Sequence, residues 1–333
     1  YIYFDEMGRS GFGFQNHWVT LQISRDSENW GAGNNIDLAL SNKSPSYDYI
    51  LISSDYGNIR VNYIHGFLEN ITSNTNRFIN ARGIEWTNNK SIIIGLSEII
   101  IYSGENRSLD IGYLNPIASH LELELNNRLN RIGDHLANAV WQLHLDIYLK
   151  SRSRLSLNLL FDEFVLDPKI EIGKEHGKAF SMRYSFNALH NKKRILNLFV
   201  NTIKVGTPTF RHGNGSNNFI NNNKPLGWHY GSDAQNINIG LNYLIPKKLI
   251  FNLQLGILEK GSESILSRPY EPYLDYQKSV FPTSPTTQIL YINSETHWKI
   301  RDFLSLTNKN QFNYIENYQR EMHFSFGFIY SYF

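Results

Sequence analysis

The sequence contains no cysteine among its 333 residues and no run of about 18 consecutive apolar residues. The first absence excludes a disulfide framework and any metal or redox centre built on thiolates. The second excludes a transmembrane helix, because such a helix needs about 20 mainly apolar residues. The chain also opens at Tyr1 without an initiator methionine or a signal-like apolar segment, so we expect a processed or truncated form.

An excess of charge of one sign is also lacking. Lys and Arg total 32 and Asp and Glu total 30, which gives a formal net charge of +2. A protein that binds a polyanion normally carries a basic stripe or a strong basic excess. We therefore expect no nucleic-acid partner.

Motifs for catalysis and cofactor binding are absent as well. The sequence has no G-x-S-x-G elbow, no P-loop and no H-E-x-x-H zinc motif. His212 and His229 share one long segment, but no third metal ligand has a convincing spacing. Asp162, Glu163 and Asp167 form a carboxylate cluster that could serve acid-base chemistry or bind a cation, or could form a solvated loop rim. We favour the rim, and expect a protein without catalysis, cofactor or metal.

What the sequence does contain is a strict alternation of apolar residues. In segment 141–149 every second residue is apolar, namely Trp141, Leu143, Leu145, Ile147 and Leu149. Successive side chains of a β-strand point to opposite faces, so the pattern predicts strands with one apolar face. The same pattern recurs at 121–125, 155–161, 237–243, 249–257 and 322–332, and aromatic residues make up 14% of the chain. Together these features predict an all-β protein.

The apolar faces could point into a soluble β fold or outward to lipid. Three features favour lipid. The runs are about 10 to 13 residues long, enough to cross a bilayer at a tilt. The polar faces mix both charge signs with His and Asn, as in a hydrated lumen. Tryptophans lie near the expected strand ends, where interface girdles form, at Trp18, Trp86, Trp141 and Trp298. The sequence therefore predicts a transmembrane antiparallel up-and-down β-barrel, with a large soluble β fold as the alternative.

Short and long connections alternate along the chain. Seven short junctions are expected at 55–58, 87–90, 115–119, 150–153, 190–193, 244–248 and 299–302. Eight longer or more polar connections are expected at 26–46, 70–76, 103–107, 130–136, 164–177, 206–233, 261–286 and 316–320. The alternation predicts one barrel domain over 1–333 with about 16 strands (16–18), and a short N-terminal periplasmic segment at 1–11. The weakest strand predictions are 47–54 and 107–114, and Asn34–Ser41 is expected to be loop, an extra strand or a short lumenal helix.

In bacterial outer-membrane barrels the short turns face the periplasm and the long loops face outward. The long loops here carry residue types that bind sugars, since aromatic faces pack on sugar C–H groups and polar side chains bond the hydroxyls. The candidates for polysaccharide binding are Trp30, Asn34, Arg211, Trp228, His229, Tyr230, Arg268 and Tyr273. In the alternative interpretation these side chains pack the loops onto one another or contact a partner protein.

The polar strand faces contain charged residues that are expected to line the lumen. These are Glu98, Glu122, Glu124, Arg128, His144, Asp146 and Arg154. They could lace the lumen shut with ion pairs, or select solutes that pass through a pore. We favour lacing, because a diffusion porin usually has a more biased set of charges.

Several segments together resemble the Wzi-type capsule-assembly family of outer-membrane barrels. They are SRDSENWGAG at 24–33, LALSN at 38–42, ARGIEW at 81–86, GLSE at 95–98, YLNP at 113–116 and FDEF at 161–164 with Asp167, and they cover roughly residues 20 to 170. The resemblance implies a monomeric barrel in the bacterial outer membrane whose external loops hold surface polysaccharide without catalysis.

The partners expected on this basis are surface polysaccharide, outer-membrane lipid and lipopolysaccharide, with envelope proteins as a further class. Two other functions stay open. One is a passive pore or transporter, and the other is a structural barrel that docks partner proteins in an envelope assembly.

Overall fold

The computed structural model describes residues 8–72, 74–115, 137–149, 152–162, 173, 175–274, 278–316 and 320–330. Antiparallel strands dominate this part of the chain. Its only α-helix is α1 (Ile111–Leu114). None of the described residues form a helix long and apolar enough to span a membrane.

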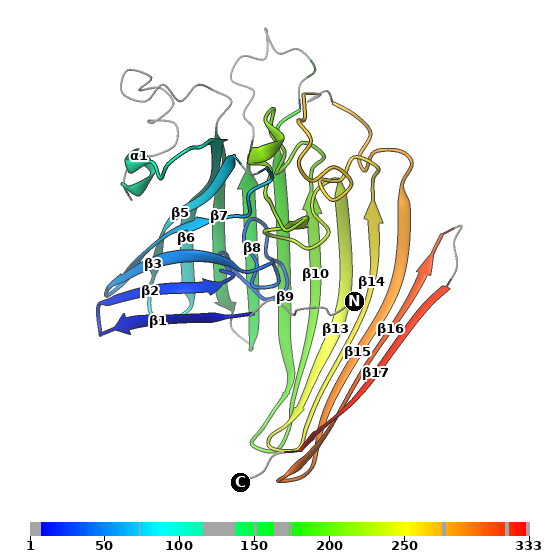
Figure 1. Ribbon diagram of the computed structural model, residues 1–333. Coiled ribbons are helices and arrows are strands. Elements are labelled where there is room, and N and C mark those ends of the chain that lie inside the picture. Colours follow the sequence, from blue (N-terminus) through cyan, green and yellow to red (C-terminus); the bar gives the residue numbers. More distant parts are fainter. Residues whose placement is uncertain are drawn as a thin grey trace.

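Among the described residues, fifteen strands form one sheet in which each strand pairs with the next sheet strand along the chain. They are β1 (Ser10–Gln15), β2 (Val19–Asp26), β3 (Tyr47–Tyr56), β4 (Ile59–Phe67), β5 (Thr75–Thr87), β6 (Ile92–Glu105), β7 (Ala137–Leu149), β8 (Ser153–Phe161), β9 (Lys178–His190), β10 (Ile195–Val205), β13 (Ala234–Ile245), β14 (Leu249–Lys260), β15 (Thr287–Arg301), β16 (Leu304–Ile315) and β17 (Arg320–Tyr330). A separate hairpin, β11 (Ile220–Asn221) with β12 (Lys224–Pro225), lies in the connection between β10 and β13. The sheet curls around a lumen (Figure 1). The predicted up-and-down antiparallel architecture is confirmed.

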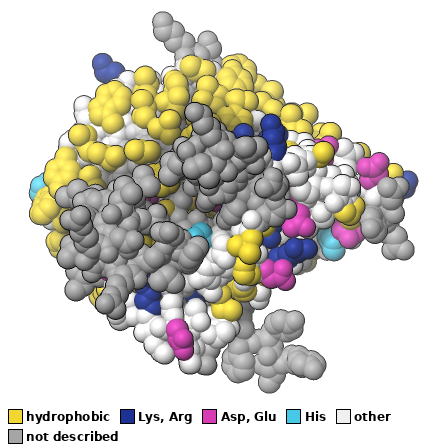
Figure 2. All heavy atoms as spheres, turned by 90° about the horizontal axis from the view of Figure 1, so that it is seen from above, with side chains coloured by type: hydrophobic (Ala, Val, Ile, Leu, Met, Phe, Trp, Pro, Cys, Tyr) yellow, Lys and Arg dark blue, Asp and Glu magenta, His cyan; other side chains and the backbone are white. Residues whose placement is uncertain are grey.

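The apolar face of the sheet points away from the lumen. On β13, Ile237 and Ile239 are 53% and 55% exposed, whereas Asn236 and Asn238 on the other face are buried. On β17, Phe326 and Phe328 are more than two-thirds exposed. Hydrophobic side chains accordingly lie along the upper and left parts of the outer edge in the view from above (Figure 2). Leaving one such side chain in water rather than in an apolar medium costs about 1.5–3 kcal/mol, so an apolar band of this extent is suited to lipid.

Three of the four tryptophans singled out from the sequence lie at the tight-turn end of the sheet. Trp18 is in the turn before β2, Trp86 is near the end of β5, and Trp298 pairs with the first residue of β14. All three side chains are 44–49% exposed. Trp141 pairs with the last residue of β8 and so lies toward the long-loop end. This distribution is typical of interface girdles.

Six of the predicted short junctions join strands that are neighbours in the sheet, and β3 confirms the strand predicted at 47–54. The strand predicted at 107–114 is wrong. Asp110 accepts a 2.9 Å hydrogen bond from the N–H of Gly112 and caps α1, and the buried ring of Tyr113 stacks on Tyr102 at 4.4 Å. The sheet instead continues directly from β6 to β7. The strand predicted at 121–125 lies outside the described residues.

A short turn that the sequence analysis did not include joins β1 to β2. The side-chain oxygen of Asn16 accepts hydrogen bonds from the N–H groups of Trp18 (2.9 Å) and Val19 (2.8 Å), which is an Asx-type turn. Ser10 and Gly11, assigned from the sequence to a periplasmic segment, belong to β1.

Candidate functional site

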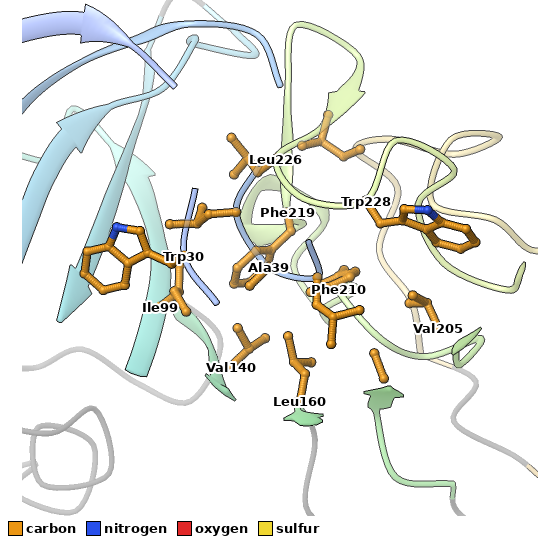
Figure 3. Close-up of a cluster of buried hydrophobic side chains, with 14 of the residues drawn as sticks. Trp30, Ala39, Ile99, Val140, Leu160, Val205, Phe210, Phe219, Leu226 and Trp228 are labelled. Carbon is orange, nitrogen blue, oxygen red and sulfur yellow. The ribbon is translucent and has the colours of Figure 1, made fainter. Parts of the chain in front are cut away.

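Two long connections fold back into the lumen and fill it. Residues 27–46 and 206–233 are termed the plug. Apolar side chains of both segments are fully buried, including Ile36, Leu38 and Leu40 of the first and Phe219 and Leu226 of the second. They pack against inward-facing strand residues such as Ile99, Val140, Leu160 and Val205 (Figure 3). The centre of the barrel is therefore an apolar core at the level of the plug.

The two plug segments are joined by backbone hydrogen bonds. The N–H of Ser41 donates to the carbonyl of Leu226 (2.9 Å), and the N–H of Trp228 donates to the carbonyl of Leu38 (3.1 Å). Gly227 lies between these bonds, and a Cβ at this position would be 1.7 Å from the Leu38 carbonyl oxygen. The segment Asn34–Ser41, for which a strand or helix was a possibility, is neither, and contains only one isolated bridge, from Leu40 to Trp30.

Polar residues of the barrel wall hold the first plug segment. Asn158 on β8 accepts from the N–H of Ala32 (2.7 Å) and donates to the carbonyl of the same residue (2.9 Å). Gln142 on β7 donates to the carbonyl of Trp30 (2.9 Å). Buried backbone polar groups need such partners, because an unpaired one costs about 1–3 kcal/mol. The polar face of the strands thus stabilises the loop that closes the lumen.

Arg77 on β5 holds the second plug segment. Its side chain is almost fully buried and donates to the carbonyls of Ser216 (2.6 Å), Asn218 (3.0 Å) and Ile220 (3.0 Å). The guanidinium also lies 5.2 Å from the ring centroid of Tyr270. The sequence analysis did not single out Arg77, because an isolated arginine on a polar strand face does not reveal its partners.

Four of the residues predicted to bind polysaccharide hold the loops together in the structure. Trp30 and Trp228 are only 9% and 4% exposed and belong to the apolar core. The side chain of Arg211 is fully buried, donates to the carbonyl of Glu263 (2.8 Å) and lies 3.9 Å from the ring centroid of Tyr273. Burial lowers the pKa of Arg211 below its ordinary value. These contacts are those of the alternative interpretation, in which the loops pack onto one another.

The other predicted sugar-binding residues are more accessible, but they do not form one cluster. His229 is exposed, and its ring lies 4.0 Å from that of the partly buried Tyr230. Burial raises the pKa of Tyr230 to about 12. The Arg268 side chain is 50% exposed, in the connection after β14. Asn34 lines a cavity on the other side of the plug.

The described members of the predicted lumenal network make ion pairs or hydrogen bonds between strands, either neighbouring ones or, for His144 of β7 and Glu85 of β5, across the intervening β6. Glu98 pairs with Arg82 (2.7 Å), and both side chains are less than a tenth exposed. His144 contacts Glu85 (3.0 Å), and Asp146 accepts from Arg154 (2.7 Å). Glu122, Glu124 and Arg128 lie outside the described residues. The described contacts join strands of the wall to one another on the lumenal face, two of them between adjacent strands and one across β6.

Three polar-lined cavities lie between the plug and the tight-turn end of the barrel. One of about 380 Å³ is bounded by Glu28 and Trp30 of the plug. A second of about 550 Å³ is bounded by Asn35 and Lys43. A third of about 560 Å³ is bounded by Asn34. The lumen is thus apolar at the plug and lined mainly by polar residues below it.

The carboxylates and histidines considered as metal ligands are not gathered into a site. Asp162 is buried and accepts a hydrogen bond from the N–H of Phe210. The His212 ring accepts from the N–H of Asn214 (3.0 Å). Glu163 and Asp167 lie outside the described residues, and within the described ones no three His, Cys, Asp or Glu side chains are grouped to hold a metal.

These features define the class of the fold, which is that of an outer-membrane β-barrel, here with a plug in its lumen. The solved structure of Wzi, described as an outer-membrane protein involved in group 1 capsule assembly in Escherichia coli and a carbohydrate-binding β-barrel, is similar with a TM-score of 0.65 at 10% identity, covering 96% of this chain and 76% of that one. The Pseudomonas aeruginosa proteins OccK10 (OpdN) and OccK3 (OpdO) are similar with TM-scores of 0.51 and 0.50 at 8% and 9% identity. These two alignments cover 98% and 96% of this chain, and 84% and 78% of the respective partners.

No protein-family model matches the sequence, and no curated protein matches it. At the identities above, the likeness to solved structures shows the fold alone.

Proposed function

We propose that this barrel lies in the bacterial outer membrane and binds surface polysaccharide at its long-loop end, without catalysis. The plug is the observation that carries the proposal. Residues 27–46 and 206–233 place a buried apolar core inside the lumen, whereas a diffusion pore needs a water-filled path. A barrel that binds a ligand through its loops does not need a water-filled path. The likeness to Wzi, itself described as carbohydrate-binding, is in keeping with this function.

The accessible side chains at the long-loop end suit a saccharide. His229 and Tyr230 lie beside the end of β14, where Lys260 is 6.0 Å from the Tyr230 ring centroid. Arg268, in the connection that follows, has a half-exposed guanidinium that lies 3.6 Å from Glu263 and 3.7 Å from Glu271, and its remaining N–H groups can donate to a ligand. Aromatic faces with adjacent donors are the usual combination for sugar rings and their hydroxyls. In this proposal the long loops lie outside the cell, and lipid and lipopolysaccharide surround the apolar band.

Binding of the detergent-purified barrel to polysaccharide from the surface of its own source tests the proposal. The variant His229→Ala, Tyr230→Ala, Arg268→Ala removes two exposed side chains and the partly buried ring of Tyr230, which lies 5.4 Å from the Trp228 ring, so the thermal transition of the variant is measured alongside binding to show that it folds. Arg301→Ala, an exposed arginine at the tight-turn end, is the matched control. We expect saturable binding that weakens at least tenfold in the triple variant and is unchanged in the control. A folded barrel that does not bind its polysaccharide would contradict the proposal.

A second candidate is a gated pore, which the three polar cavities below the plug favour. In this case the plug would move aside to connect them with the long-loop end. Planar-bilayer recordings distinguish the two functions. A stable conductance in the intact protein would support the pore, whereas electrical silence together with polysaccharide binding would support the first proposal.

A further inference from the structure

One cavity below the plug carries a positive charge that the proposed function does not use. This cavity, of about 560 Å³, lies between Asn34 on the plug and His190 at the tight turn after β9. Arg152, Arg154 and Arg183 line it. Of these three cations, Arg154 is paired with Asp146.

Arg183 is the buried cation of this cavity. Only 8% of the residue is exposed, and it donates to the side-chain oxygen of Asn201 (3.0 Å) with its guanidinium 3.9 Å from the ring centroid of Phe199. In the described part of the chain no carboxylate lies within ion-pair distance of it. A buried cation without an anion costs several kcal/mol, so the site is complementary to an anionic group.

The rest of the lining offers hydrogen-bond donors and acceptors. Asn34, Asn187, Asn197 and Asn242 contribute amides, Ser153, Ser156 and Ser185 contribute hydroxyls, and Tyr148 contributes an aromatic side chain. Such groups match a ligand with several hydroxyls, and the volume lies within the range of about 300–1,000 Å³ typical of small-molecule sites.

We propose that this cavity is a second binding site, for a saccharide that bears a carboxylate, that is, a uronic acid. Arg183 and Arg152 would bond the carboxylate, since the guanidinium matches its geometry. The amides and hydroxyls would bond the ring hydroxyls. Because the plug separates this cavity from the long-loop end, the ligand enters from the tight-turn side, where Arg152 and His190 are exposed. The site is distinct from the polysaccharide surface proposed above.

Calorimetric titration of the detergent-purified barrel with galacturonate, galactose and acetate tests this inference. We expect galacturonate to bind, and galactose and acetate each to bind at least tenfold more weakly, because each lacks half of the recognised chemistry. Equal affinity for galactose would show that the cations are not used. Equal affinity for acetate would show a general anion site. Either result, or no binding of galacturonate, overturns the proposal.

Two substitutions assign the ligand to this cavity. Arg183→Gln and Arg152→Ala should each weaken galacturonate binding at least tenfold, and Arg152 is an exposed turn residue whose removal leaves the fold intact. Lys309→Ala is the matched control, because Lys309 lines a different cavity and pairs with Glu295 (2.8 Å). Unchanged binding in both arginine variants would overturn the assignment. The triple variant at the long-loop end should bind galacturonate normally, which separates this test from that of the proposed function.

Discussion

The side-chain amide of Gln142 on β7 donates a 2.9 Å hydrogen bond to the backbone carbonyl of Trp30, and so joins the barrel wall to the plug. The oxygen of this amide accepts a hydrogen bond from the N–H of Ala39 (3.3 Å), which lies in the same plug segment as Trp30. Gln142 thus bonds two points of a loop that has little secondary structure of its own.

Gln142→Ala should loosen the plug without breaking the sheet. The substitution leaves a buried carbonyl and a buried N–H unpaired, so we expect a loss of about 1–3 kcal/mol in plug docking. Bilayer recordings should then show intermittent conductance that the parent protein lacks. Gln311→Ala removes an exposed amide of β16 and serves as the control. Identical recordings for both variants would contradict this role of Gln142.

Gly227→Ala should disturb the contact between the two plug segments. The added methyl group would meet the Leu38 carbonyl, and overpacking of this kind costs about 1–3 kcal/mol. Gly213→Ala, in the same plug segment, is the control because its Cβ would have only one neighbour, at 3.7 Å. Limited proteolysis of the folded barrel should cleave the first variant faster within the plug. Equal cleavage of the two would show that Gly227 is not constrained by the close approach.

Stability should depend on pH through Asp37, a buried carboxylate of the plug. Burial raises its pKa above the ordinary value of 3.8, although the hydroxyl of Ser41 donates to it (3.0 Å). The folded state therefore favours the protonated form, and its contribution to stability is complete below pH 3.8 and is lost as pH rises through the folded-state pKa. Asp37→Asn should raise the thermal transition at pH 7 and have little effect at pH 3.5.

The matching control is Asp302→Asn. Lys299 donates to the Asp302 side chain in an exposed turn and lowers the pKa of that carboxyl. The contribution of Asp302 to stability is therefore present at neutral pH and lost as pH falls, opposite to that of Asp37. A gain in stability for Asp37→Asn that is the same at both pH values would mean that ionisation of Asp37 is not the cause.

The direction of the apolar face can be tested at two adjacent positions of β14. Leu255 points outward and is 38% exposed, whereas Gln254 lines a lumenal cavity. Leu255→Arg should reduce the free energy of unfolding in lipid vesicles by up to about 2–4 kcal/mol, because it places a charge on the lipid face. Gln254→Arg should fold nearly as well as the parent. The reverse order of stability would mean that the faces are assigned the wrong way round.

The lumenal ion pairs should differ strongly in their contribution to stability. Glu98→Ala leaves Arg82 buried without its carboxylate, which costs about 3–5 kcal/mol. Glu295→Ala breaks an exposed pair with Lys309 and should cost less than about 1 kcal/mol. Urea unfolding in detergent measures both losses, and equal values would contradict the burial of the Arg82–Glu98 pair.

The strands could be predicted from the sequence because their signal is local. Alternation such as that at 237–243 reflects the two faces of a single strand and needs no knowledge of its neighbours. The same reasoning failed at 107–114, where a capped turn of helix and the stacking of Tyr113 on Tyr102 outweigh a short alternating pattern.

The site was harder to predict because its contacts are not local. Trp30 and Trp228 looked like exposed loop aromatics, and only the fold brings both into one buried core. Loops that fold inward and loops that face solvent have similar compositions, so the plug has no signature in the sequence. The role of Arg77 could not be predicted for the same reason, because the three carbonyls that accept its hydrogen bonds all lie in a distant connection.

The distance along the chain between the plug's partners also sets an order of assembly. Asn221 donates to the carbonyl of Ser46, which is 175 residues away, and Asn158 bonds Ala32 across 126 residues. Contacts between such remote residues form only after the intervening chain has been brought together. The hydrogen bonds that hold the first plug segment can therefore form only after most of the wall strands have formed. We therefore expect closure of the lumen to be a late step in folding, after the wall strands that hold the plug have come together.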